Sequence, residues 1–247
     1  MTPEMAIPGV AARIARLLDR GKRVLVVTNA AGYPSHADGA LRRAWLSFRR
    51  GRVISSRATC LAAIAGRDLG CLGVVAPGGS GLSGLAGRDL VELADDPGSY
   101  VRADNILFLG SGDWTEARQA LLVTALRDRP RPVLVANPDI VATRETGFSI
   151  EPGSYAHRLA DDTGVVPEFF GKPFANIYDL SFQRLGPGTD RTRVLMVGDS
   201  LHTDILGAQA ARTGSALVTS HGFFGGFAPA PWVRKSGIRP DYVLDHP

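Results

Sequence analysis

The segment Arg193-Val194-Leu195-Met196-Val197-Gly198-Asp199-Ser200 decides the fold class of this sequence of 247 residues. The run Arg193–Val197 is short and mostly apolar, which is typical of a buried parallel strand. The strand is predicted to end at Gly198-Asp199-Ser200, and a helix is predicted over Thr203–Arg212. A buried strand, an acidic turn and a helix in this order indicate an α/β fold, in which ligands bind at the carboxyl ends of the strands.

The same alternation recurs along the chain. An amphipathic pattern predicts a helix over residues 8–20, which Gly21 ends, and a second helix is predicted over residues 115–127. No internal repeat or low-complexity linker interrupts the pattern, so we expect the α/β fold to extend over the whole sequence. The other predicted strands are Arg23–Thr28, Leu72–Ala76, Asn105–Leu109, Arg131–Ala136, Ser215–Thr219 and Tyr242–Leu244.

Composition excludes several classes of protein. Hydrophobic residues make up 45% and charged residues 21% of the chain, which is the range of globular proteins and not of disordered ones. No segment approaches the roughly 20 apolar residues of a membrane span, and Met1–Pro8 is too short and polar for a signal peptide. Two cysteines, Cys60 and Cys71, are too few for a disulfide framework or a four-cysteine zinc site. We therefore expect a cytoplasmic protein.

The net charge of +4 comes with one dense basic cluster, which has two interpretations. It is either a nucleic-acid-binding patch or a solvated helix face. No aromatic ladder or DNA-binding motif accompanies it, which favours the solvated face. We expect no nucleic-acid and no membrane partner. The cluster consists of Arg42, Arg43, Arg49, Arg50 and Arg52.

Polar residues with a common chemistry follow the predicted strands. Thr28 and Asn29 come after the first strand, Lys172 lies in Gly171-Lys172-Pro173, and Asp199 and Asp204 follow Arg193–Val197. A hydroxyl, an amide and a lysine bind phosphoryl oxygens, whereas carboxylates suit Mg²⁺. Each piece alone also fits a helix cap or a surface turn. The three together, in this order, favour phosphoryl transfer.

These segments resemble the motifs of phosphatases of the haloacid dehalogenase (HAD) superfamily, in the class IIA branch that includes nitrophenylphosphatase-like and nucleotide-phosphatase-like enzymes. The resemblance covers essentially the whole chain. The second, third and fourth family motifs match Val26–Asn29, Gly171–Pro173 and Val197–Ile205. The branch's other segments match Ile7-Pro8-Gly9, Asn137-Pro138-Asp139, Glu151–Ser154 and Arg239–Tyr242.

The resemblance implies a Rossmann-like parallel-sheet core, residues 1–54 and 165–247, with an inserted α/β cap over residues 55–164. Thr28, Asn29 and Lys172 would bind the phosphoryl group, with Lys172 as the catalytic cation. Asp199 would bind Mg²⁺, and Asp204 would bind or support it. The substrate would be a small phosphorylated metabolite chosen by the cap, and caps of this branch often form homodimers.

One element that the resemblance implies is absent from the sequence. These enzymes form an aspartyl-phosphate on a D-x-D motif at the end of a first strand, shortly before the Ile-Pro-Gly segment. Met1–Ala6 contain no Asp, and Asp19 and Asp38 are misplaced for this role. Because a missing central strand leaves unpaired backbone groups that cost roughly 1–3 kcal/mol each, we expect the working protein to be longer, with a mis-called start at Met1 or Met5 as the cause.

Two other functions are compatible with the sequence. A pseudoenzyme would keep the phosphate site and bind phosphate compounds without turnover. An oxidoreductase would use Gly79-Ser80-Gly81-Leu82-Ser83-Gly84, which fits the dinucleotide-binding pattern G-x-G-x-x-G after a strand-like run. The second alternative is the weaker one, because Gly87 interrupts the helix that should follow the glycines.

Overall fold

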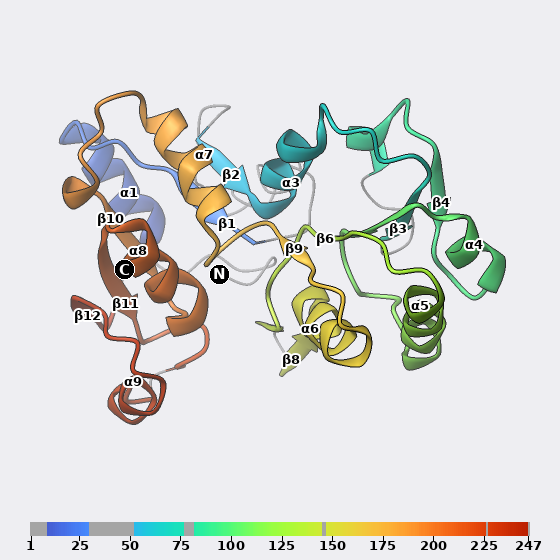
Figure 1. The fold of residues 1–247 in the computed structure, drawn as a ribbon. Helices are drawn as coiled ribbons and strands as arrows, with labels where there is room; N and C mark the ends of the chain where they lie inside the picture. Colours follow the sequence, from blue (N-terminus) through green and yellow to red (C-terminus); the bar gives the residue numbers. More distant parts are fainter. Residues whose placement is uncertain (1–8, 30–51, 77–81, 145–146, 226, 247) are drawn as a thin grey trace.

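The structure is a computed structural model that describes residues 9–29, 52–76, 82–144, 147–225 and 227–246. It shows an α/β fold with parallel sheets, as the sequence predicts (Figure 1). No helix within these ranges is long and apolar enough to cross a membrane. Most of the basic cluster, Arg42 to Arg50, and half of the glycine motif, residues 79–81, fall outside the described residues.

The larger sheet has five parallel strands in the order β4-β3-β5-β6-β9. Its strands carry apolar residues on both faces, so helices cover it on both sides. Helix α3 packs on one face, and α4, α5 and α6 pack on the other. The strands are β3 (Leu72–Val75), β4 (Leu90–Glu92), β5 (Asn105–Phe108), β6 (Val133–Val135) and β9 (Glu168–Phe169), and the helices are α3 (Ser56–Ile64), α4 (Pro97–Arg102), α5 (Glu116–Asp128) and α6 (Pro152–Thr163).

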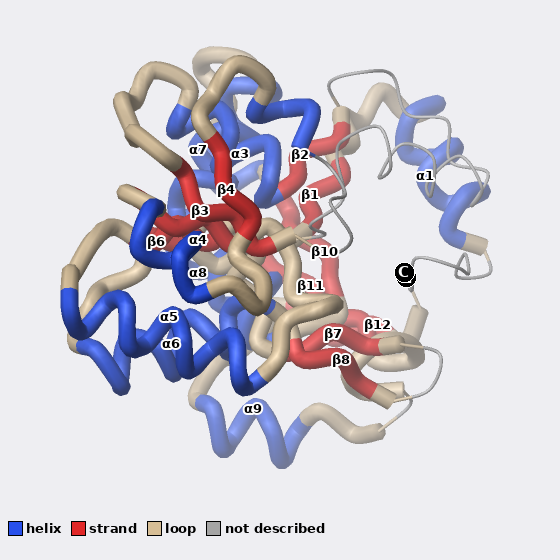
Figure 2. The backbone as a smooth tube through the Cα atoms, turned by 90° about the vertical axis from the view of Figure 1, so that its right-hand side faces the viewer, coloured by secondary structure: helices blue, strands red, loops and turns tan. Residues whose placement is uncertain are grey.

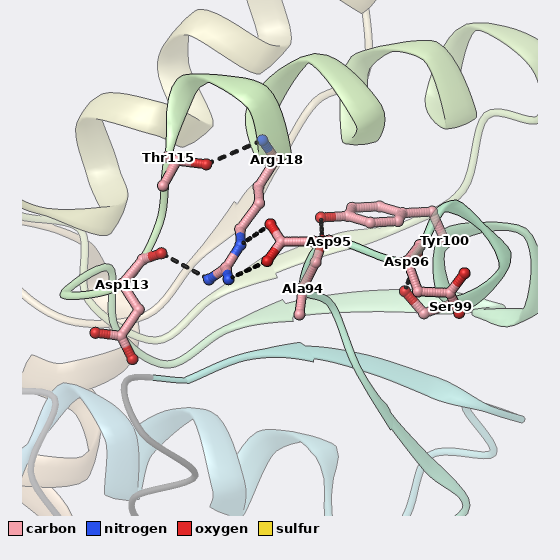
Figure 3. Close-up of polar contacts among 8 residues, drawn as sticks. All are labelled: Ala94, Asp95, Asp96, Ser99, Tyr100, Asp113, Thr115 and Arg118. Carbon is pink, nitrogen blue, oxygen red and sulfur yellow. Dashed lines mark hydrogen bonds and ion pairs between the residues drawn. The ribbon is translucent and has the colours of Figure 1, made fainter.

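Arg118 ties the loops of this unit together at the start of α5 (Figure 3). Its guanidinium donates to both carboxylate oxygens of Asp95, at 2.8 and 2.9 Å, and to the carbonyl oxygen of Asp113. Tyr100 of α4 donates its hydroxyl proton to the carbonyl oxygen of Ala94 nearby. These contacts join the loop before α4 to the loop before α5, and they lie apart from the site described below.

Two smaller parallel sheets lie on the other side of the molecule (Figure 1). One pairs β1 with β2, and the other has the order β10-β11-β12. Helix α1 packs on one face of the β1–β2 pair, and α7 packs on the other and also contacts α8. The strands are β1 (Val26–Thr28), β2 (Val53–Ser55), β10 (Leu195–Gly198), β11 (Gly214–Val218) and β12 (Tyr242–Leu244), and the helices are α1 (Val10–Asp19), α7 (Ala175–Leu185), α8 (Leu206–Ala211) and α9 (Ala230–Ser236).

A short antiparallel hairpin links the two sides. Its strands are β7 (Val141–Thr143) and β8 (Phe148–Ile150). The ring of Phe148 stacks on Phe223, which follows β11, with ring centres 6.1 Å apart and planes 12° apart. Through this pair, a hairpin inserted between β6 and α6 contacts a loop that leaves β11.

Two details differ from the sequence-based expectations. Strand β10 is not buried on one face: Leu195 and Val197 are 49% and 45% exposed, because within the described residues β10 is the edge strand of its sheet. The helix predicted over Thr203–Arg212 begins earlier, with a π-helical turn over Leu201–Ile205. The backbone N–H groups of Asp204 and Ile205 both donate to the carbonyl oxygen of Ser200, and this widens the first turn.

Candidate functional site

The predicted site residues gather where β1 and β10 end. Asn29 follows β1, and Asp199 follows β10. Gly171-Lys172-Pro173 connects β9 to α7 and passes between them, since Lys172 bonds to Asn29 on one side and to Asp204 on the other. Strands β1 and β10 belong to separate sheets, and Figure 2 shows both sheets in the same part of the molecule. The structure therefore brings three of the sequence motifs into one cluster.

A buried ion pair forms the centre of this cluster. The Nζ atom of Lys172 donates to Oδ1 of Asp204 at 2.7 Å, and the two side chains are only 12% and 4% exposed. Burial alone would lower the pKa of the Lys172 ammonium, but the charge of Asp204, followed by those of Asp139 and Asp199, raises that pKa above its usual value. Lys172 thus carries a fixed positive charge at the edge of the sheet.

The second oxygen of Asp204 organises the loop after β10. It accepts the backbone N–H groups of Asp199 and Ser200, both at 3.1 Å. A Cβ at Gly198 would lie 2.1 Å from this oxygen, so the approach requires glycine there. Asp204 is therefore fully engaged by the ammonium and two backbone donors, and it holds the Asp199 turn in place.

Asp199 presents a carboxylate with different surroundings. No other described residue donates a hydrogen bond to it. Burial, and then the charge of Asp204, raise the pKa of this carboxyl, while Lys172 lowers it. The backbone of Gly222, in the loop after β11, lies against the same carboxylate. A half-buried carboxylate without hydrogen-bond donors favours a nearby cation.

The donor set fits Mg²⁺ of the kind that binds one or two protein carboxylates, several waters and a substrate phosphate. Asp199 is the residue that would hold the ion, with Asp204 in support. Within the described part of the chain, no group of three or more His, Cys, Asp or Glu side chains is placed to hold a metal ion.

Asn29 is used differently from the simple phosphate contact that the resemblance implies. Its Nδ2 donates to Oδ1 of Asp139 and to the carbonyl oxygen of Lys172, both at 2.8 Å. Its Oδ1 accepts the backbone N–H of Lys172 at 2.8 Å. With 4% of the residue exposed, the side chain brackets the backbone of Lys172.

Thr28 completes the set of site residues predicted from the sequence, and His202 lies within the matched segment Val197–Ile205. Thr28 ends β1 in register with Ser55 and is half-buried. His202 is exposed within the π-helical turn, so the structure gives it no place among the site residues. Cys60, one of the two cysteines, is fully buried in α3, and burial raises the pKa of its thiol to about 12.

Two residues near the site were given no specific role from the sequence. Asp139 belongs to Asn137-Pro138-Asp139, which the sequence matched to the family insert without assigning a role. Gly222 lies in a glycine-rich loop, and nothing in the sequence distinguishes it from Gly225. Both reach the site through contacts between segments far apart in the chain.

The chain is similar in sequence and in fold to known phosphatases. A family model described as HAD-hydrolase-like matches residues 169–246. The acid sugar phosphatase of Staphylococcus aureus (strain MRSA252) is 28% identical over 73% of this chain and 67% of its own length. The acid sugar phosphatase of Staphylococcus haemolyticus (strain JCSC1435) is 31% identical over 49% of this chain and 47% of its own length, so this chain matches about half of that relative.

The fold is shared with a solved phosphatase over nearly the whole chain. The p-nitrophenyl phosphatase from Archaeoglobus fulgidus superposes with a TM-score of 0.77 at 21% identity, covering 97% of this chain and 89% of its own. The family model matches the segment that holds Lys172, Asp199 and Asp204. In residues 169–246 the chain is similar to HAD-hydrolase-like proteins, and its fold over nearly the whole chain is that of a solved phosphatase.

Proposed function

We propose that this chain binds the phosphoryl group of small phosphate monoesters in the presence of Mg²⁺, as part of a phosphatase. The observation that carries the proposal is the buried Lys172–Asp204 pair beside the Asp199 carboxylate. A fixed cation and a carboxylate that accepts no hydrogen bond from another described residue, both following the ends of parallel strands, suit a phosphate that arrives with its metal ion. The named activity of the staphylococcal relatives makes sugar phosphates the first substrates to test.

The residues have distinct proposed roles. Lys172 neutralises charge on the phosphoryl oxygens, and the Thr28 hydroxyl donates to one of them. Asp199 holds Mg²⁺, which would offset the negative charge of the phosphoryl group when bound. Asp204 keeps Lys172 and the Asp199 turn in position. We keep the division into a core of residues 1–54 and 165–247 and a cap of residues 55–164 as part of the proposal, with substrate choice and any dimer contact assigned to the cap.

Turnover needs a nucleophile as well. In the reaction that the family resemblance implies, an Asp carboxylate attacks phosphorus, the alcohol leaves, and water then releases phosphate from the aspartyl-phosphate. The printed sequence contains no D-x-D motif. We expect turnover by a chain in which a strand ending in D-x-D stands ahead of Ile7-Pro8-Gly9.

A phosphate-binding module without catalysis is the alternative function. Hydrolysis of p-nitrophenyl phosphate by the extended chain separates the two functions. Mg²⁺-dependent release of nitrophenol that Asp199→Asn abolishes supports the phosphatase. An extended chain that binds phosphate but stays inactive supports the binding module.

Binding is tested on the chain as printed by titrating inorganic phosphate with and without Mg²⁺, using calorimetry. We expect Lys172→Ala to weaken binding at least about tenfold, since a charge-assisted contact contributes on the order of 1.5–3 kcal/mol. Lys235→Ala, which removes an exposed lysine of α9, is the matched control and should bind as the unmodified chain does. Equal weakening in both variants would exclude Lys172 as the phosphate ligand.

A further inference from the structure

Asp139 connects the unit of the five-stranded sheet to the site through its side chain. It stands at the end of Asn137-Pro138-Asp139, directly after β6, and its carboxylate accepts the Asn29 amide at 2.8 Å. Its backbone N–H donates to Oδ1 of Asn137, whose own amide donates to the buried carboxylate of Glu151. The carboxylate of Asp139 is thus held in place before it meets Asn29.

The Asn29 amide transmits this position to Lys172. An amide has two N–H donors and one acceptor oxygen, and here all three functions are used. One donor binds Asp139, and the other donor and the oxygen bind the backbone of Lys172 on both sides of its Cα atom. The orientation of the amide, and with it the place of the Lys172 backbone, depends on the acceptor that Asp139 supplies.

The surroundings leave little room for another arrangement. A Cβ on Gly171 would lie 2.6 Å from Oδ1 of Asn29, and 2.9 Å from the ring of Pro138. Gly171 also has a φ of +126°, which L side chains rarely adopt. The strand end of β1, the turn after β6 and the Gly171-Lys172 segment are therefore in direct van der Waals contact as well as hydrogen-bonded.

We propose that Asp139 is a positioning residue for Lys172, which it orients through the Asn29 amide. The series of contacts runs from Asp139 to Asn29, to the backbone of Lys172, and through the Lys172 ammonium to Asp204. Displacement of the turn after β6 would release the amide and let the lysine leave its partner. In this proposal the turn after β6, which belongs to the unit of the five-stranded sheet, sets the position of the Lys172 ammonium. The inference rests on the proposed role of Lys172 in binding phosphate.

The chain has a feature that makes this testable without turnover: it contains only three lysines, Lys22, Lys172 and Lys235. Lys22 and Lys235 are exposed, whereas Lys172 is buried in its ion pair. Brief acetylation with acetic anhydride, followed by peptide mass spectrometry, measures the reactivity of Lys172 against two internal references. Protection of Lys172 reports directly on whether it is held in place.

Asp139→Ala should raise the acetylation of Lys172 at least about fivefold relative to the two reference lysines. Without the hydrogen bond to Asn29, the segment opens locally more often and exposes the Lys172 amine to the reagent. Asp139→Asn should keep protection within about twofold, because its side-chain oxygen still accepts the Asn29 amide. Rescue by Asn and loss with Ala separate the hydrogen bond from bulk packing. If Asp139→Ala does not fold, Asp139→Ser, whose side chain is too short to reach Asn29, takes its place.

Asp104→Ala is the matched control. Like Asp139, Asp104 is a carboxylate that accepts a side-chain donor from another segment, here Arg129. It also accepts the backbone N–H of Cys71. It precedes β5, at the opposite end of the same sheet from Asp139. This variant should lose thermal stability without exposing Lys172. A folded Asp139→Ala protein with unchanged Lys172 labelling, or an equal rise in Asp104→Ala, would overturn the proposal.

The phosphate titration keeps this inference distinct from the proposed function. If Asp139→Ala exposes Lys172 but the unmodified chain binds no phosphate, the positioning role stands and the phosphate role fails. If phosphate binds and depends on Lys172, but Asp139→Ala leaves both labelling and affinity unchanged, the phosphate role stands and the positioning role fails.

Discussion

The backbone of Gly222 lies directly against the carboxylate of Asp199: a Cβ on Gly222 would sit 1.5 Å from Oδ2 of Asp199. Gly222 follows β11 and Asp199 follows β10, and the two strands are neighbours in a parallel sheet. Their carboxyl ends therefore face the same edge. The contact makes the loop after β11 one wall of the proposed metal site.

Gly222→Ala should displace the Asp199 carboxylate and weaken metal binding at least about tenfold, about 1.4 kcal/mol. The measurement is a Mn²⁺ titration followed by electron paramagnetic resonance, with Mg²⁺ as competitor. Gly225→Ala is the control, because Gly225 also has a positive φ of 53° but its Cβ would come no nearer than 3.9 Å to its closest neighbour. Equal weakening in both would mean that backbone strain, and not the contact with Asp199, sets the affinity.

Lys172→Met should destabilise the protein by about 3 kcal/mol, because it leaves the buried Asp204 carboxylate without its cation. The two backbone N–H donors to Asp204 remain and keep the loss at the lower end of the usual range. Urea unfolding followed by circular dichroism measures the change. Lys235→Met, on the exposed face of α9, should stay within about 0.5 kcal/mol of the unmodified chain. A near-zero change for Lys172→Met would show that the ion pair contributes no stability.

The Cys60 thiol predicts how stability depends on pH. Burial raises its pKa from 9.0 to about 12 in the folded chain, so above pH 9 the unfolded chain loses a proton that the folded chain keeps. The free energy of unfolding should therefore fall as pH rises from 9 towards 12, by about 1.4 kcal/mol per pH unit from this group. The contribution is fully present below pH 9.

Urea titrations at pH 8, 9, 10 and 10.5 measure this slope, and Cys60→Ala removes the contribution of Cys60. The variant should be less stable at pH 8 because of the cavity it leaves, but its stability should fall less steeply above pH 9. Tyr100, whose pKa burial raises to about 12, adds the same slope to both proteins and cancels in the comparison. Parallel curves for the two proteins would contradict the assignment.

The stacked rings of Phe148 and Phe223 should show a coupling energy of about 0.5 kcal/mol in a double-mutant cycle to Ala, the low end for aromatic pairs, since the residues are 63% and 40% exposed. Thermal or urea unfolding of the four proteins gives this value. A second cycle between Phe148 and Phe227, a more exposed ring of the same loop, should give additive changes. Coupling of equal size in both cycles would indicate a general loosening of the loop and not a specific stack.

The sequence predicted the strands well where apolar runs are short and end at polar turns. Tyr242–Leu244 was predicted at its observed bounds, and Asn105–Leu109 differs from β5 by one residue. These runs carry their own signal, because β-branched and leucine-rich segments bounded by turn residues have few alternatives in an α/β chain. The start of the helix after β10 was wrong because one carbonyl, that of Ser200, accepts two N–H groups, and no residue pattern encodes that.

The site divides in the same way. The sequence selected Lys172, Asp199 and Asp204 by chemical type and order, and the structure places them together. The sequence could not predict the partners of Asn29, because Asp139 and Lys172 lie 110 and 143 residues further along the chain. The sequence also contained no sign that position 222 requires glycine, because the requirement comes from the carboxylate of Asp199, which follows another strand.

The hydrogen bonds of Asn29 to Asp139 and to the backbone of Lys172 also limit which chimeras of related proteins can fold with an intact site. Exchange of the unit of the five-stranded sheet between relatives would transplant the turn after β6 together with its carboxylate. A donor unit that lacks an acid at the position of Asp139 would leave an amide with no acceptor and a lysine whose backbone is no longer bracketed. Compatible chimeras should therefore be chosen by this one pairing before any property of the substrate pocket is considered.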